Sequence, residues 1–302
     1  MRVASVLPSA TEIVCALGHR ADLVARSAEC DYPADVADLP IVMRPRSLDA
    51  DRPSGEIDAR VRAERAEGES LYTLDVERLR ALAPDLLLTQ DLCGVCSVTP
   101  AEVSAACATA GIAPTVLALT PRRLAEVWGT VETVARALGD PDAGERLATA
   151  LRARTTAPST GSSPARVAVV EWLDPPILAG LWTPDLVRAA GARSIGPAPG
   201  EPGTRTTWSA IRDAGPTLVV LSPCSFSVDR ARRELADPAL AAAVAALAPP
   251  AGTYVADEAY FSRPGPRLAD GAELLRHLLT GSTGPAPMPV EPLLRGARGV
   301  VA

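Results

Sequence analysis

The sequence predicts an α/β protein of two Rossmann-like lobes, joined by a long helix, with a ligand cleft between the lobes. Short apolar runs alternate with helical patterns along the chain, one arrangement of helix, strand and cysteine occurs twice, and a helical stretch separates the two copies. We place the first lobe at residues 1–120, the connecting helical segment at 121–156 and the second lobe at 157–302.

The repeated arrangement centres on two apolar runs that follow a proline. Residues 84–96 hold a proline, a leucine-rich run and two cysteines with C-x-x-C spacing, and residues 216–224 hold a proline, an apolar run and one cysteine. A helical pattern that ends at a glycine precedes each copy, over residues 11–18 and 184–191. Apolar runs of this kind are typical of buried parallel strands, and open α/β sheets bind ligands at the carboxyl ends of their strands. We therefore expect these cysteines at the mouth of the cleft.

The first lobe begins with a strand over residues 2–7. Ser9 and Glu12 form the S-x-x-E pattern of a capping box, so a helix is predicted to start there and to end at Gly18. A second short strand is predicted over residues 23–26.

Residues 43–70 are rich in charged side chains, and they predict a surface excursion with solvated charges in which a helix starts near Ser54. A helix over residues 74–82, a helix over 100–111 and a strand over 114–119 complete the first lobe.

The connecting segment shows the strongest helical periodicity. Thr120 is predicted to cap a helix with Pro121 in its first turn, and its apolar residues recur up to Leu138. A second helix is expected over residues 141–154, and a strand over residues 166–172 opens the second lobe.

Composition excludes several classes of protein. With 302 residues and 47% hydrophobic content, the chain can bury substantial cores. A net charge of -6 and a pI near 5.1 argue against sequence-independent nucleic-acid binding. No apolar run approaches the ~20 residues that span a membrane, and the first residues do not resemble a signal peptide. We expect a cytoplasmic protein without membrane insertion, in which the cysteines stay reduced.

Aromatic residues are scarce, at 3% of the chain, yet Trp172 and Trp182 both lie near predicted strand ends. Indole side chains lining a cleft would suit a flat and largely apolar ligand. Core filling explains each tryptophan equally well from the sequence alone.

Four cysteines fall in predicted loops, whereas Cys15 and Cys107 lie on helical patterns where a cysteine acts as a small hydrophobe. Thiolates select zinc or iron–sulfur clusters, so four converging thiols would suit a metal site. Thiols that contact the ligand or take part in redox chemistry, and thiols without special role, remain open alternatives. The predicted metal ligands are Cys30, Cys93, Cys96 and Cys224.

Four motifs, at residues 7–18, 29–33, 91–96 and 260–267, resemble the substrate-binding proteins of ABC importers that have a long connecting helix. Within that family the chain resembles the cobalamin-binding branch, as a cytoplasmic, cysteine-containing subgroup. The resemblance implies a corrinoid held between the lobes and delivered to a membrane permease. With the polar residues of these motifs included, the predicted ligand contacts are Pro8, Ser9, Cys30, Asp31, Tyr32, Asp91, Glu171, Trp172, Trp182, Phe226, Tyr260 and Arg263.

The sequence leaves two functions open. The first is a binding protein without covalent chemistry, with cobalamin as its ligand. The second is a cytoplasmic enzyme that uses a cysteine-bound zinc or iron–sulfur cluster, with Glu171 or Arg263 as polar partner. His19 and His277 lie far from any motif, and no common catalytic fingerprint occurs. The sequence therefore favours the binding protein.

Replacing Cys93 and Cys96 by serine distinguishes these two functions. Corrinoid affinity should stay nearly unchanged in the binding protein, because a flat ligand is held mainly by aromatic and backbone contacts. In the enzyme, the same change should abolish the metal content, since thiolates would hold the metal. Metal analysis after anaerobic purification and a corrinoid absorption titration measure the two outcomes.

Overall fold

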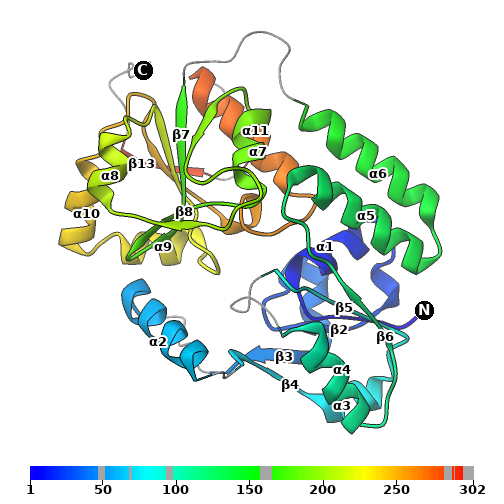
Figure 1. The fold of residues 1–302 in the computed structure, drawn as a ribbon. Coiled ribbons are helices and arrows are strands. Elements are labelled where there is room, and N and C mark those ends of the chain that lie inside the picture. The colour runs from blue at the N-terminus through cyan, green and yellow to red at the C-terminus, as the bar shows by residue number, and fades with distance from the viewer. Residues whose placement is uncertain are drawn as a thin grey trace. The chain divides into compact units, whose positions relative to one another are not determined.

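The computed structural model describes residues 1–46, 52–67, 70–92, 98–156, 165–281, 288 and 290–294. The chain packs as two compact units, each with its own mostly parallel sheet and surrounding helices, which confirms the predicted α/β class (Figure 1). The first unit comprises Met1–Ala50, Ala59–Pro121 and Glu126–Ala150, and the second comprises Asp51–Asp58, Arg122–Ala125 and Leu151–Ala302. Two short stretches, Asp51–Asp58 and Arg122–Ala125, therefore belong to the second unit, although the sequence on either side of each belongs to the first.

The first unit contains a six-stranded sheet in which β4 alone runs antiparallel to its neighbour. Strand β1 lies in the middle and pairs with both β2 and β5. In sheet order the strands are β4 (Tyr72–Leu74), β3 (Ile41–Pro45), β2 (Leu23–Ser27), β1 (Val3–Ser5), β5 (Leu86–Thr89) and β6 (Thr115–Ala118).

Alternation along β1 places helices on opposite faces of this sheet. Ser5 meets Thr11 of α1 (Pro8–Ala16), with 2.9 Å between the two hydroxyl oxygens. Ala4 points the other way and joins the apolar core that contains Val103 of α4. The remaining helices of this part of the chain are α2 (Ser54–Ala66), α3 (Val76–Leu82), α4 (Pro100–Thr109), α5 (Leu124–Leu138) and α6 (Pro141–Arg154), with short 3-10 turns at Arg20–Asp22 and Ala34–Asp38.

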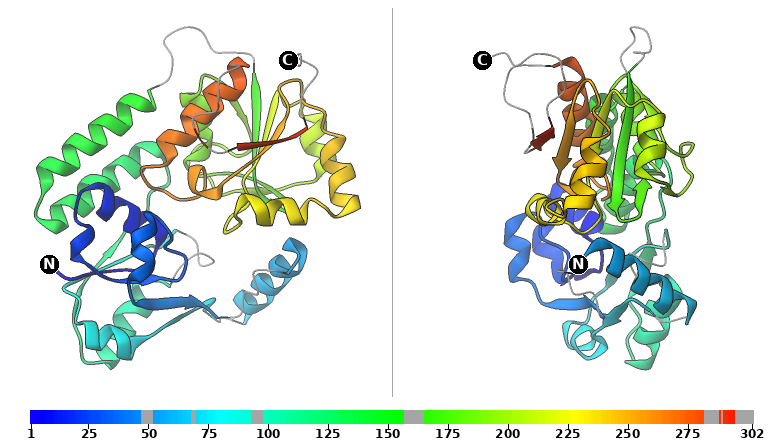
Figure 2. Two further views of the ribbon diagram at one scale, coloured as in Figure 1. Left: turned by 180° about the vertical axis from the view of Figure 1, so that it is seen from behind. Right: turned by 90° about the vertical axis from the view of Figure 1, so that its left-hand side faces the viewer.

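The second unit contains a seven-stranded sheet whose centre is the parallel pair β7 and β11. Helices lie on both of its sides, with α7 against α11 and α8 against α10 (Figure 2). Its strands are β10 (Thr204–Arg205), β8 (Pro176–Leu178), β7 (Arg166–Leu173), β11 (Leu218–Leu221), β12 (Thr253–Ala256) and β13 (Val290–Leu294), with β9 (Arg193–Ile195) also on β7. Its helices are α7 (Thr183–Ala189), α8 (Trp208–Asp213), α9 (Val228–Glu234), α10 (Pro238–Ala245) and α11 (Leu268–Thr280), with a 3-10 turn at Glu258–Tyr260.

The repetition predicted from the sequence is confirmed at the ends of α1 and α7. Gly18 and Gly191 follow these helices with φ values of +85° and +84°, a conformation that glycine adopts without steric cost. Each glycine amide donates to the carbonyl three residues earlier, at 2.9 Å in both cases. In both units the strand after the proline, β5 or β11, lies parallel to the unit's first strand.

The predicted capping box at Ser9 is wrong. Helix α1 starts at Pro8 with Leu7 as its N-cap, and Ser9 lies inside the first turn with only 3% of its surface exposed. Proline fits this first position because its φ is already helical and its missing amide has no partner there. Helix α3 also starts later than predicted, at Val76, because Tyr72–Leu74 forms a strand and Asp75 caps the helix through the Arg78 amide.

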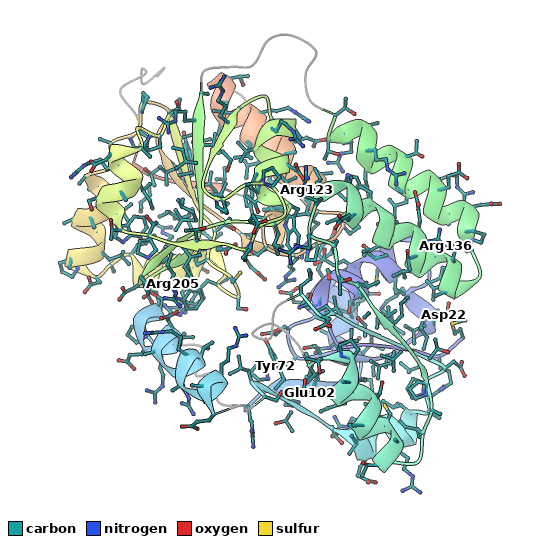
Figure 3. All side chains as sticks on the ribbon, in the orientation of Figure 1. Asp22, Tyr72, Glu102, Arg123, Arg136 and Arg205 are labelled. Carbon is teal, nitrogen blue, oxygen red and sulfur yellow. The ribbon has the colours of Figure 1, made fainter. Side chains whose placement is uncertain are left out.

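Helix α2 begins at Ser54, as predicted, but the expectation of fully solvated charges is wrong for its first turns. Asp58 is only 7% exposed and forms a bidentate ion pair with Arg205, the side chain beside α2 in Figure 3. The pattern of charges on the helix could not show this, because the partner lies in a strand 147 residues away.

The start of α5 is set by a side chain from α7 and not by Thr120. The helix begins at Leu124, whose amide donates to Asp185 at 3.2 Å. Arg123 binds the same carboxylate with two hydrogen bonds of 2.8 and 3.0 Å, and Arg188 adds a third at 2.6 Å. Burial alone would raise the pKa of Asp185, but these hydrogen bonds and charges outweigh it and hold the pKa below its usual range.

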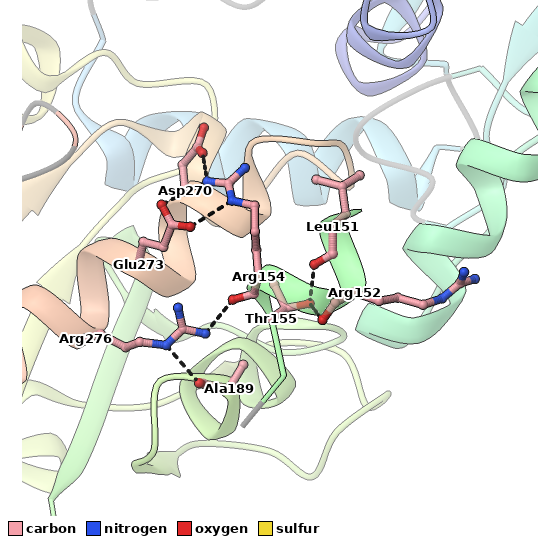
Figure 4. A network of polar contacts seen from close by, with 8 residues as sticks. All are labelled: Leu151, Arg152, Arg154, Thr155, Ala189, Asp270, Glu273 and Arg276. Atoms are coloured by element: carbon pink, nitrogen blue, oxygen red, sulfur yellow. Dashed lines mark hydrogen bonds and ion pairs between the residues drawn. The ribbon is translucent and has the colours of Figure 1, made fainter. Parts of the chain in front are cut away.

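The end of α6 is fixed to α11 by a network of arginines and carboxylates (Figure 4). Arg154 donates to Glu273 at 2.7 and 2.9 Å and also to Asp270. Arg276 of α11 donates to the Arg154 carbonyl at 2.6 Å and to the Ala189 carbonyl of α7 at 3.2 Å. The hydrogen bonds from Arg154 lower the pKa of Glu273. These contacts hold the last residues of α6, Leu151–Arg154, within the second unit.

Exchanging Asp185 for asparagine should lower the free energy of unfolding by about 1–3 kcal/mol at neutral pH, because a buried carboxylate loses charge-assisted hydrogen bonds. The Asp185 pKa is lowered in the folded state, so its contribution is present above about pH 4 and is lost as the pH falls through the lowered pKa. Urea unfolding between pH 2 and 7 measures this. Asp213→Asn, in an exposed ion pair with Arg212, should change stability by less than about 0.5 kcal/mol. Equal losses in both variants would contradict the role of Asp185 as a cap.

Candidate functional site

The carboxyl edge of the first sheet has a switch point between β1 and β5. Ser5 pairs with Leu88, and the Val6 amide donates to the Leu88 carbonyl at 3.0 Å, so the two strands end side by side. Beyond this point the chain enters α1 from one strand and α4 from the other, and these helices cover opposite faces. Ligands bind open α/β sheets in the crevice that such divergence leaves. Two predicted contacts lie here, Pro8 at the start of α1 and the exposed Asp91 after β5.

The loop after β2 separates its predicted contacts into buried and exposed side chains. Cys30 is 1% exposed, and its sulfur lies 3.0 Å from the Thr11 hydroxyl of α1. The Arg26 guanidinium donates to the Cys30 carbonyl at 3.1 Å and fixes the loop. Asp31 is exposed and Tyr32 is 50% exposed. Cys30 thus lies in the interior of the unit, whereas Asp31 and Tyr32 are accessible to a ligand.

A pocket of about 310 Å³ opens at the same edge of the first sheet, between β4 and the start of α4. Tyr72 and Glu102, labelled in Figure 3, lie on its two sides, and the Tyr72 hydroxyl donates to the Glu29 carboxylate at 3.3 Å. The sequence prediction missed this pocket because it depends on the antiparallel pairing of β4. Its lining residues are Arg46, Ser70, Tyr72, Thr73, Leu74, Val98, Glu102, Val103 and Ala106.

The second sheet has the corresponding switch point between β7 and β11. Val170 pairs with Leu221, and the amide of Cys224, in the loop after β11, donates to the carbonyl of Glu171 in β7 at 2.9 Å. Glu171, Trp172 and Cys224 are all partly exposed at this carboxyl edge. The structure therefore brings together three of the predicted site residues from strands about 50 residues apart, which the rule for parallel sheets anticipates.

An aromatic pair extends this edge of the second unit. The ring centroids of Trp172 and Phe226 are 5.4 Å apart with the planes tilted by 55°, an arrangement that aromatic rings favour. The Trp172 indole nitrogen donates to the Asp174 carbonyl at 3.1 Å, and the Arg230 guanidinium lies 4.4 Å from the centre of the Phe226 ring. Arg230 was missed in the sequence, although it follows Phe226 by four residues.

Trp182 lies in the interior of the second unit. It is 5% exposed, and its indole nitrogen donates to the Phe261 carbonyl at 2.7 Å. The same loop holds Tyr260, which is 8% exposed, and Arg263, which binds Glu258 at 2.7 Å. Burial raises the pKa of Glu258 despite the neighbouring Arg263 charge. Trp182 and Tyr260 thus pack as core side chains, and a direct ligand contact by either remains a prediction.

The predicted metal site can be followed only in part. Cys93 and Cys96 lie outside the described residues, while Cys30 belongs to the first unit and Cys224 to the second. In the part of the chain that the structure describes, no three side chains of His, Cys, Asp or Glu gather as metal ligands. Burial raises the pKa of Cys15 to about 11 and that of Cys107 as well, which suits their expected role as small hydrophobes. The four-thiol site stays a prediction.

No protein-family model and no curated protein matches this sequence. Solved structures do match over nearly the whole chain. A periplasmic heme binding protein from Pseudomonas aeruginosa is 24% identical with a TM-score of 0.69, and the match covers 99% of both chains. The periplasmic vitamin B12 binding protein of Vibrio cholerae is 18% identical with a TM-score of 0.60, covering 92% of this chain and 96% of that one. A periplasmic heme-binding protein from Roseiflexus is 22% identical with a TM-score of 0.59 and the same coverage. At these identities the likeness establishes the two-lobe fold.

The cytoplasmic location expected from the first residues is contradicted by these structures, since all three proteins are described as periplasmic. A secretory signal is removed from a mature protein, so N-terminal residues do not by themselves report the compartment. The expectation of reduced thiols loses its basis as well. In the described part of the chain, no helix is both long and apolar enough to cross a membrane.

Replacing Gly271 by alanine should destabilise the second unit and displace the loop that carries Tyr260 and Arg263. A Cβ atom at Gly271 would lie 2.1 Å from the Tyr260 carbonyl oxygen, so α11 or the loop must move. We expect a loss of about 1–3 kcal/mol in the free energy of unfolding. Gly129→Ala in α5, where a Cβ meets no atom within 4 Å, should instead be neutral or stabilise by up to about 1 kcal/mol. Denaturant melts of both variants test this, and a stable Gly271→Ala would contradict the close approach.

Proposed function

We propose that this protein lies outside the cytoplasmic membrane, binds a tetrapyrrole, either haem or a corrinoid, and delivers it to an ABC permease in that membrane. The observation that carries this proposal is the nearly full-length fold match with proteins described as binding heme and vitamin B12. The same comparison supports the proposal of a permease partner, because similar folds include an ABC transporter substrate-binding protein and a component of an ABC-type Fe3+-hydroxamate transport system.

The second unit supplies the chemistry that a flat macrocycle needs. Trp172 and Phe226 form an aromatic pair at the carboxyl edge of the sheet, at the switch point where this class of fold binds ligands. Phe226 is only 3% exposed and supports the partly exposed Trp172 ring, which is the one that offers contact area to a ligand. Glu171 precedes Trp172 in β7 and shares a backbone hydrogen bond with Cys224, and both residues are partly exposed at this edge.

The first unit adds accessible polar groups at its own carboxyl edge. Tyr32 is half exposed, and Asp31 and Asp91 are exposed. Tyrosine is also one of the residues that bind haem iron in proteins. The neighbouring pocket presents Arg46 and Ser70, which suit the carboxylate or amide groups at the edge of a tetrapyrrole. These polar side chains favour a macrocycle with a polar periphery.

The alternative of a cysteine-dependent enzyme finds no support in the comparisons, since the matched structures named above are described as binding or transport proteins. Cobalamin as the specific ligand, the choice of the sequence prediction, competes with haem. Both share the flat macrocycle, so the aromatic pair does not discriminate between them.

Absorption titrations with hemin and with cyanocobalamin test the proposal. We expect the wild type to shift one of the two spectra at micromolar protein concentration. Trp172→Ala should weaken that binding about tenfold, because aromatic contact contributes ~1.5 kcal/mol beyond the buried area. Asp213→Asn, exposed at the last residue of α8 just before β11 begins, serves as the control and should bind like the wild type. Failure of the wild type to bind either compound would overturn the proposal.

A further inference from the structure

The first five residues of α2, Ser54–Asp58, are part of the second unit, although the chain enters this helix from β3 and leaves it toward β4. Ser54 has no exposed surface, and Ile57 and Asp58 are each 7% exposed. By contrast, the side chain of Glu56 is 58% exposed and forms an ion pair of 3.2 Å with Arg52, whose side chain is 48% exposed. One face of the helix start is therefore buried against the rest of the second unit.

Polar contacts on this buried face converge on α9. The Ser54 amide and hydroxyl both donate to one carboxylate oxygen of Glu234, at 2.7 and 2.6 Å. The other oxygen of Glu234 accepts a hydrogen bond of 3.0 Å from Arg230, whose guanidinium also donates to the Arg52 carbonyl. Glu234 and Arg230 have side chains only 8% and 10% exposed, so each depends on these partners for its buried charge.

The same guanidinium reaches the aromatic pair. Arg230 lies 4.4 Å from the centre of the Phe226 ring, and Phe226 packs against Trp172. The helix start thus connects to Trp172 through Glu234, Arg230 and Phe226, each in contact with the next.

A second route leads from α2 to the same tryptophan. A Cβ atom at Gly55 would lie 2.5 Å from a carboxylate oxygen of Asp174, so the helix backbone passes directly over this side chain. The Asp174 carbonyl accepts the Trp172 indole hydrogen at 3.1 Å. Asp58 holds the helix in place through its bidentate ion pair with Arg205, a residue of β10.

We propose that the start of α2 positions Trp172 for ligand binding, with Ser54, Asp58 and Glu234 as positioning residues. A segment that lies between β3 and β4 in the sequence then sets the position of the Trp172 ring in the second unit. The ligand part of this inference rests on the proposed function, whereas the effect on Trp172 does not.

The indole resonance of Trp172 in a ¹H–¹⁵N correlation spectrum reports its position without any ligand. It is assigned with Trp172→Phe, and the buried Trp182 resonance serves as an internal reference for correct folding. We expect Asp58→Asn and Glu234→Gln to shift the Trp172 resonance while Trp182 stays in place. Hemin and cyanocobalamin titrations of the same variants should show about five- to tenfold weaker binding of whichever compound the wild type binds. Glu56→Gln, the same kind of change on the exposed face of the helix, should leave both readouts unchanged.

Distinct results separate this inference from the proposed function. If the Trp172 resonance in Asp58→Asn and Glu234→Gln coincides with that in Glu56→Gln, the positioning role is overturned, whatever the ligand. If the resonance shifts but the wild type binds neither compound, the proposed function fails and the structural coupling stands. Should Glu234→Gln lose the Trp182 reference and fail to fold, Ser54→Ala removes one hydrogen bond to Glu234 and supplies the same test.

Discussion

In both units a strand at the centre of the sheet hydrogen-bonds to parallel neighbours on either side, β1 to β2 and β5, and β7 to β9 and β11. Parallel pairing requires that all carboxyl ends meet at one edge and that the connections cross over the faces. The residues of the candidate site on β7 and β11 follow from this constraint, because Glu171 and Trp172 lie at the end of β7 and Cys224 lies in the loop after β11. Glu171 and Cys224, for example, share a backbone hydrogen bond only because β7 and β11 end together.

Buried charge is the second feature on which the structure depends. The side chains of Asp58, Asp185, Glu234 and Glu258 are only 5–11% exposed, and each binds an arginine. The chain has no lysine, so arginine is the residue available for such pairs. Its planar guanidinium also suits the role, because it offers parallel donors to both oxygens of a carboxylate. These pairs fix helix starts and loops that apolar packing alone would leave undetermined.

The two tryptophans at predicted strand ends show how equal sequence signals lead to different environments. Trp182 donates to the Phe261 carbonyl and is buried, whereas Trp172 is partly exposed and packs against Phe226 with its ring tilted. The difference arises because Trp182 precedes a helix that packs into the unit, while Trp172 lies at the end of a central strand. A residue's place in the sheet, and not its distance from a strand in sequence, decides whether a ligand can reach it.

The sequence by itself determined the α/β class, the repetition of helix, strand and terminal glycine, the paired helices α5 and α6, and the loops that carry most of the candidate site. These features are local, since an apolar run, a glycine with positive φ or a helical period is decided within a few residues. Only the tertiary structure decided that α5 starts at Leu124, that Cys30 is buried, that β4 closes a pocket and that the start of α2 binds Glu234 and passes over Asp174. Those outcomes depend on partners that lie far apart, 61 residues between Leu124 and Asp185 and 180 between Ser54 and Glu234. No local pattern records such partners, because burial and pairing exist only once the sheets have formed.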